Sequence, residues 1–150
     1  MPLNLPLSKN DGSPKSKLVL GLTKGSVFSV ELYWDSTHDL DAHALLGTDT
    51  GNGAKVDAFE LVLSAYNLKS NTPAGLLSFN PGGKSFSTPC GTLTHSGDMR
   101  TGVGKDVDEV ITSDGGKCPP GVNEIPVFVT IHDSAKNGAT FAKVTRAGIR

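Results

Sequence analysis

Hydrophobic and polar residues alternate in several short stretches of the chain, as they do in strands that bury one face. Apolar side chains share one face from Val27 to Trp34, and the same period returns from Asp39 to Leu46. The alternation from Ile125 to Ile131 is the strongest in the second half, and Pro126 fits the start or the edge of that strand because it lacks an N–H. These segments predict an antiparallel all-β fold.

Other segments give weaker signals. Leu18–Leu20 predicts a first strand after an N-terminal arm over residues 1–17. The apolar residues of Ala58–Tyr66 fit both a strand and a helical face, and we favour the strand. A helical pattern over Ala139–Ala147 predicts a short C-terminal helix. Many short strands with turns between them are typical of an antiparallel β-sandwich.

Composition agrees with one folded domain spanning residues 1–150. The chain is 37% hydrophobic, has a net charge of −1, and contains 18 glycines and 9 prolines, which argues against disorder and for many turns. Residues 70–92 are rich in Pro, Gly, Ser and Thr, with a hairpin turn at 80–83, and we interpret them as an inserted β-arm. The sequence shows neither a membrane span nor a signal peptide, so we expect a cytosolic protein or a component of an assembled particle.

Acidic residues are concentrated in two internal segments, 31–70 and 98–114, while both ends of the chain are basic. If the two acidic segments meet in space, they need positive charge between them. A basic stripe with interleaved aromatic residues is missing, so we expect no nucleic-acid surface.

Both acidic segments contain candidate metal ligands. Asp39 and Asp41 fall on one face of a strand, and the Gly-rich stretch from Gly97 to Glu109 could present oxygen ligands, which calcium prefers. The loop is not an EF-hand, because Arg100 and Gly102 occupy the third and fifth positions counted from Asp98. From the residues alone, solvated loop carboxylates remain the simpler alternative.

Several motifs resemble the TerD family of tellurium-resistance and chemical-stress proteins, and they fall in the order and approximate spacing of that family. They are Trp34-Asp35, Asp39-Leu40-Asp41-Ala42, Tyr66-Asn67, Gly97-Asp98-x-Arg100-Thr101-Gly102-x-Gly104, Asp108-Glu109-Val110-Ile111 and Thr130-Ile131-His132-Asp133. The resemblance covers about residues 7–150.

This resemblance implies a non-enzymatic calcium-binding β-sandwich that holds one or two Ca²⁺ ions. The implied ligands are Asp39, Asp41, Asn67, Asp98, Gly102, Asp106, Asp108 and Glu109. The chain departs from the family pattern at Met99 and Val107, where the family has Asn and an acidic residue. Asp106 stands where the family usually has Gly and could replace a lost ligand. His43 replaces a small residue beside the Asp39 and Asp41 pair.

From the resemblance we expect the sandwich to lack the last strands of the family domain. A sheet that lacks strands exposes unpaired backbone groups at an edge. We expect the 70–92 arm to fill that edge, or another chain to do so by strand addition or self-assembly. The alternative function is therefore a structural component of a phage virion or another large assembly.

An enzymatic function is the weakest alternative. His132-Asp133 could form a general base with an orienting carboxylate, and Cys90, His95 and Asp98 could form a nucleophilic site. No nucleophile motif surrounds Cys90, so we expect no enzymatic activity. Cys90 and Cys118 are interpreted as reduced loop thiols, with a disulfide as the alternative.

Overall fold

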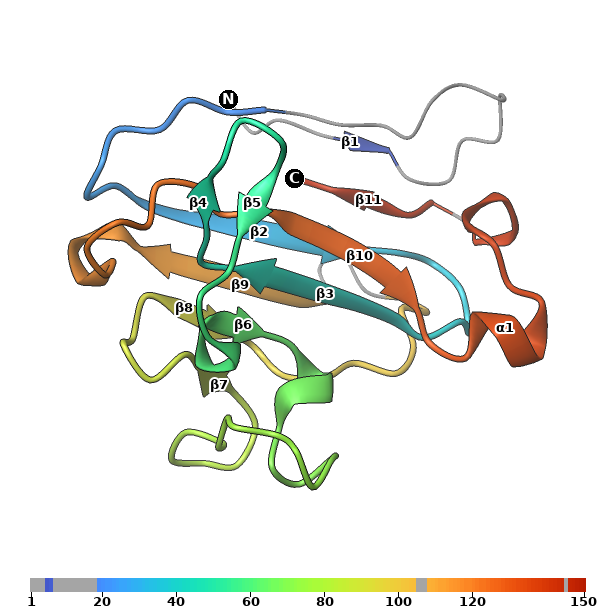
Figure 1. The fold of residues 1–150 in the computed structure, drawn as a ribbon. Helices are drawn as coiled ribbons and strands as arrows, with labels where there is room; N and C mark the ends of the chain where they lie inside the picture. Colours follow the sequence, from blue (N-terminus) through green and yellow to red (C-terminus); the bar gives the residue numbers. More distant parts are fainter. Residues whose placement is uncertain (1–4, 7–18, 105–107, 145) are drawn as a thin grey trace.

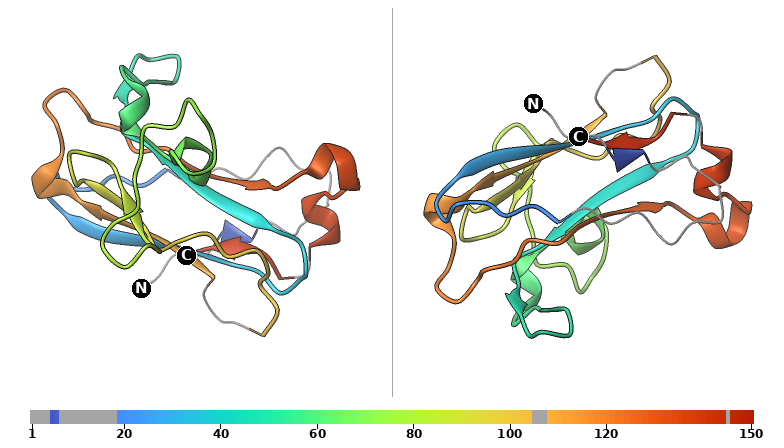
Figure 2. Two further views of the ribbon diagram at one scale, coloured as in Figure 1. Left: turned by 90° about the horizontal axis from the view of Figure 1, so that it is seen from below. Right: turned by 90° about the horizontal axis from the view of Figure 1, so that it is seen from above.

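The computed structural model describes residues 5–6, 19–104, 108–144 and 146–150. Two facing antiparallel sheets make up the molecule, and a small hairpin is added to them (Figures 1 and 2). This arrangement confirms the predicted all-β sandwich. The larger sheet has the order β1-β11-β2-β9-β8-β7, the smaller sheet the order β10-β3-β6, and β4 and β5 pair as the hairpin.

The strands are β1 (Leu5–Pro6), β2 (Val27–Tyr33), β3 (Leu40–Leu45), β4 (Thr48–Asp49), β5 (Ala54–Lys55), β6 (Val62–Leu63), β7 (Phe86–Ser87), β8 (Leu93–His95), β9 (Glu109–Asp114), β10 (Val127–Ile131) and β11 (Gly148–Ile149). A single turn of α-helix, α1 (Ser134–Asn137), follows β10. Short 3₁₀ turns lie at Phe59–Leu61, Ala65–Asn67, Gly115–Lys117 and Phe141–Lys143.

Each of the two sheets contains one long strand pair. In the larger sheet β2 runs antiparallel to β9, from Val27 opposite Asp114 to Leu32 opposite Glu109. In the smaller sheet β10 runs antiparallel to β3, from Val127 opposite Ala44 to Ile131 opposite Leu40. The three strands with the clearest alternation in the sequence are therefore β2, β3 and β10.

The core lies between the two sheets and consists of side chains that alternate inward along their strands. The larger sheet contributes Leu32, Ile111, Leu93 and Phe86, and the smaller sheet contributes Leu40, Ala42, Ala44 and Leu63. All of these residues are buried. Trp34 closes the core just beyond β2, where the chain turns toward β3.

Three local predictions differ from the structure. Val19 and Leu20 lie outside any strand and are exposed, because no neighbouring strand in the described residues pairs with them. The segment Ala58–Tyr66 is a strand only at Val62–Leu63, between two 3₁₀ turns. The α-helix lies at Ser134–Asn137, and among the described residues of Ala139–Ala147 only the 3₁₀ turn Phe141–Lys143 is helical, while Ala139, Val144 and Ala147 pack into the core.

The 70–92 segment and the C-terminal residues both join the larger sheet. Within 70–92, Phe79 bridges to Phe86, and β7 pairs with β8 at one edge. At the other side β11 pairs with β2, and Arg150 exchanges backbone hydrogen bonds with Glu31. Both cysteines are free thiols. In the part of the chain that the structure describes, no helix is long and apolar enough to cross a membrane.

Candidate metal centre

The corner between β2 and β3 positions the first two acidic residues. The indole of Trp34 donates a hydrogen bond from Nε1 to the His38 carbonyl at 2.9 Å, which shapes the turn. The His132 N–H donates to the Asp39 carbonyl at 2.8 Å, so the backbone of Asp39 continues the pairing of β3 with β10. Side chains two residues apart in extended chain share a face, and Asp39 and Asp41 therefore lie on the same side.

The loop that carries Asp98 packs against this corner. The Gly102 N–H donates to the Ser36 carbonyl at 3.1 Å. A Cβ at Gly102 would lie 2.5 Å from both Trp34 Cδ1 and the Trp34 carbonyl oxygen, so only glycine allows the two segments to approach this closely. This contact brings Asp98 next to Asp39 and Asp41.

The carboxylates of Asp39, Asp41 and Asp98 form one cluster, in which one oxygen from each lies within 4.8 Å of the others. Asp39 Oδ1 is buried and has no hydrogen-bond partner among the described residues. Burial, then the charge of Asp39, raises the pKa of Asp41 to about 7. Burial, then the charge of Asp98, raises the pKa of Asp39 to about 6.

The positive charge nearest to Asp98 is Arg100, an exposed side chain whose Nε lies 3.7 Å from Asp98 Oδ2, so the three carboxylates outnumber it. All three donors are carboxylate oxygens, two of them are partly or fully removed from water, and one oxygen is orphaned. This donor set fits a hard divalent cation, and calcium accepts such oxygens in flexible geometry.

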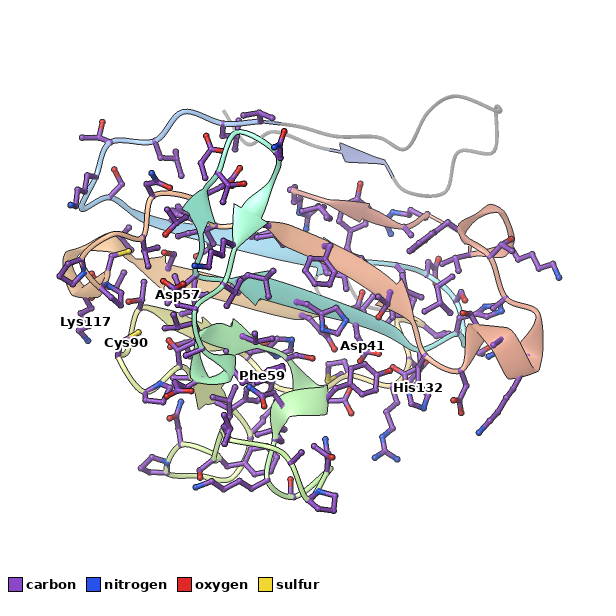
Figure 3. The ribbon with its side chains drawn as sticks, viewed as in Figure 1. Asp41, Asp57, Phe59, Cys90, Lys117 and His132 are labelled. Atoms are coloured by element: carbon purple, nitrogen blue, oxygen red, sulfur yellow. The ribbon has the colours of Figure 1, made fainter. Side chains whose placement is uncertain are left out.

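Tyr66 and His132 flank the cluster (Figure 3 labels Asp41 and His132). The Tyr66 hydroxyl donates to Asp41 Oδ2 at 3.1 Å and lies 2.7 Å from His132 Nδ1. A hydroxyl has a single proton, so when Asp41 is ionised and accepts it, His132 Nδ1 carries a hydrogen and donates it to the Tyr66 oxygen. His132 Nε2 lies 3.5 Å from Asp133 Oδ2. The sequence marked His132-Asp133 as a pair but gave no sign that Tyr66 joins it to Asp41.

Asp108 and Glu109 point into the sandwich. Asp108 Oδ2 accepts a hydrogen bond from the Trp34 N–H at 2.9 Å. Glu109 is 1% exposed, and its carboxylate accepts hydrogen bonds from the N–H groups of Ala42 and Met99. Its Oε2 also lies 3.2 Å from His95 Nε2. Both side chains bind backbone segments next to the cluster.

Asn67 lies among different partners. Its Nδ2 donates to the carbonyls of Phe59 and Val62, and its Oδ1 accepts from the Leu76 N–H. The amide thus fastens the two 3₁₀ turns to the following loop. Of the other implied ligands, Gly102 lies against Trp34 as described, and Asp106 lies outside the described residues.

Cys90 and His95, which the sequence suggested for nucleophilic chemistry, contact different partners. Cys90 Sγ contacts the hydroxyls of Thr88 and Thr92. His95 Nδ1 accepts from the Gly97 N–H at 3.0 Å, while its Nε2 faces Glu109. His95 therefore has a structural partner on each ring nitrogen.

Comparisons with known proteins identify the family of the chain. The model of the TerD domain matches residues 13–150. Bacillus subtilis (strain 168) has an uncharacterized protein YceE that is 30% identical over 97% of this chain and 67% of its own length. Stress response protein SCP2 of the same organism is 31% identical over 87% of this chain and 65% of its own length. Tellurium resistance protein TerD of Alcaligenes sp is 31% identical over 98% of this chain and 63% of its own length.

The chain thus spans about two thirds of the length of the curated relatives it matches. The family model covers nearly all of the chain, including β2, β3, β9 and β10 with their acidic connections. This chain belongs to the TerD domain family.

Proposed function

We propose that this domain is a non-enzymatic calcium-binding module of a stress-response or tellurium-resistance system. Asp39, Asp41 and Asp98 would be the central ligands, and Asp108 and Glu109 lie on the segments directly behind them. Relatives named for stress response and tellurium resistance support the biological setting. A bacterial cytoplasmic location is part of the same proposal.

One observation carries the proposal: three carboxylates each place an oxygen within 4.8 Å of the others, and one of them, Asp39, has a buried Oδ1 without a hydrogen-bond partner among the described residues. Like charges at this separation repel one another, and burial strengthens the repulsion because the surrounding dielectric is low. A bound divalent cation would remove that repulsion and join the β2–β3 corner to the Asp98 loop. Binding would also stabilise the folded state by mass action.

Calorimetric titration of metal-stripped protein with calcium, and separately with magnesium, tests this function. We expect saturable calcium binding that is lost in Asp41→Asn and in Asp98→Asn. Asp57→Asn is the matched control, because Asp57 is an exposed acid paired with Lys55, outside the cluster. A flat calcium trace for the natural sequence, or equal binding by Asp41→Asn, would exclude the calcium function.

A second candidate function is a structural role in a larger assembly, such as a virion. The edge strand β10 favours it. The Leu45 N–H bonds the Pro126 carbonyl, and the His132 N–H bonds the Asp39 carbonyl. In an antiparallel pair the bonding direction alternates, so Val127, Val129 and Ile131 direct their N–H and C=O groups away from β3. No strand in the described residues pairs with that side.

A second copy of the chain would fit this edge. Residues 126–131 carry no charge that would oppose strand pairing. Two-fold antiparallel pairing centred on Val129 would place Val127 opposite Ile131 of the second copy. Light scattering tests the assembly, with Val129→Pro removing one outward N–H but no bond to β3. Val129→Thr is the control, because it changes the same side chain but keeps the outward N–H. Assembly that survives Val129→Pro unchanged would exclude this edge.

A further inference from the structure

The buried side chain of Glu109 contacts both acidic segments without joining their cluster. It begins β9 in the larger sheet, and its Oε2 accepts from the N–H of Ala42 in β3 of the smaller sheet at 2.9 Å. Its Oε1 accepts from the N–H of Met99 in the loop after β8 at 3.1 Å. One carboxylate therefore connects both sheets and the loop.

Each of these N–H groups belongs to the residue that directly follows a cluster aspartate. Ala42 follows Asp41, and Met99 follows Asp98. The two oxygens of Glu109 therefore fix the distance between the backbones that carry Asp41 and Asp98. The acidic group found among the described residues contains Asp39, Asp41 and Asp98, and Glu109 is not a member.

His95 holds the Glu109 carboxylate in place. Its Nδ1 accepts from the Gly97 N–H, so its Nε2 carries the hydrogen and donates it to Glu109 Oε2 at 3.2 Å. The imidazole stacks on Phe86, with 4.7 Å between ring centroids and 12° between the planes. Glu109 Oε2 thus receives two donors, and the ring that supplies one of them is fixed by packing.

We propose that Glu109, oriented by His95, is a positioning residue that sets the spacing of the Asp41 and Asp98 carboxylates and thereby the cation affinity of the cluster. This inference rests on the proposed calcium function. It assigns Glu109 a role behind the site, in place of the ligand role that the family resemblance implies. Partners behind the ligands of metal sites typically contribute 10- to 100-fold in affinity.

Two histidine variants separate the contacts of His95. In His95→Gln the amide nitrogen can occupy the place of Nε2 and keep the bond to Glu109. In His95→Asn the amide oxygen can occupy the place of Nδ1 and keep the bond from Gly97, while the bond to Glu109 is lost. Neither substitution touches a cluster aspartate. Glu109→Gln is the direct variant, since its single oxygen cannot accept from all three donors.

The first measurement is amide hydrogen exchange in chelator. We expect the Ala42 and Met99 amides to lose protection at least tenfold in Glu109→Gln and His95→Asn, and to keep it in His95→Gln. Unchanged protection in Glu109→Gln would overturn the positioning role. The exchange measurement needs no bound metal, so it decides the role of Glu109 even if the protein binds no calcium.

The second measurement is calorimetric calcium affinity. Glu109→Gln and His95→Asn should weaken binding about 10- to 100-fold, while His95→Gln stays within about threefold of the natural sequence. If His95→Asn binds as tightly as His95→Gln, the inference is overturned. If the natural sequence binds no calcium but the exchange pattern appears as expected, the positioning role stands and the proposed function falls.

Discussion

Two acidic sites lie close together in this molecule: the side chain of Glu109, and the cluster of Asp39, Asp41 and Asp98. They differ in what compensates their negative charge. Glu109 is almost fully buried, yet both of its oxygens accept hydrogen bonds from groups of the fold. Asp39, Asp41 and Asp98 face mainly one another, and Asp39 Oδ1 has no hydrogen-bond partner in the described residues.

The difference separates a carboxylate that the fold compensates from carboxylates that a cation could compensate. A buried carboxylate that accepts several N–H bonds is compensated from within, and removing it leaves those donors unsatisfied. The aspartate cluster has fewer such donors, the Tyr66 hydroxyl on Asp41 and the exposed Arg100 beside Asp98, so most of its negative charge is left for protons or a cation to compensate. Burial alone does not distinguish the two cases; the donors do.

Removing Glu109 should have the largest effect on stability. Glu109→Ala leaves the Ala42 and Met99 N–H groups and His95 Nε2 without their acceptor inside the sandwich. We expect the free energy of unfolding in chelator to fall by about 3–5 kcal/mol. Urea denaturation checks this. A loss close to that of an exposed acid, such as Glu60→Ala, would remove the contrast between the two sites.

Removing Asp41 should act in the opposite direction. Its pKa is raised to about 7, so the ionised side chain destabilises the metal-free fold at pH 8. Asp41→Asn should raise the metal-free free energy of unfolding by about 2–4 kcal/mol and abolish stabilisation by calcium. Urea denaturation with chelator and with calcium measures both changes. A destabilised variant in chelator would show that Asp41 is compensated like Glu109.

Gly102→Ala should disturb the contact that unites the two acidic segments. The new methyl group would overlap Trp34, and the Asp98 loop would have to move. We expect a loss of about 1–3 kcal/mol in stability together with weaker calcium binding. Thermal melts and calorimetry test this, with Gly21→Ala as a comparison, since nothing lies within 4 Å of a Cβ at Gly21 and its φ is not in the left-handed region. Equal effects of the two substitutions would contradict the overlap with Trp34.

The pH dependence of the free energy of unfolding should show the smallest of these effects. Asp41 has a folded pKa above its unfolded value, so the folded state binds more protons and the metal-free protein loses stability as pH rises through about 7. Between pH 6.5 and 8 the expected loss is about 1 kcal/mol, and saturating calcium should abolish it.

A second buried group, His43, makes stability depend on pH in the opposite direction below about pH 6.5. Burial lowers its pKa to about 4, so the unfolded state gains protons first and stability is lost as pH falls below about 6.5. Denaturation curves of the natural sequence and Asp41→Asn at pH 6.5, 7 and 8 isolate the aspartate. A natural sequence that becomes more stable toward pH 8 would contradict the raised pKa.

The sequence predicted the long strands and the acidic residues that meet. Val27–Tyr33, Leu40–Leu45 and Val127–Ile131 have a period of two that tertiary contacts did not override. The clustered charge and the family resemblance together singled out Asp39, Asp41 and Asp98 as candidate ligands. Ala139–Ala147 was misassigned because an apolar spacing that fits a helix also fits irregular chain packed against a core.

The sequence by itself determined the β-rich class, the alternation that selects the buried faces, and the concentration of Asp in two segments. Tertiary structure alone decided which acids are compensated. Glu109 and Asp98 are eleven residues apart in one segment and look equally suited to bind a cation. They differ because the N–H of Ala42, from the opposite sheet, and the ring of His95 reach Glu109, while Asp98 meets two other carboxylates. Such donors come from distant parts of the chain, so a local sequence pattern cannot reveal them.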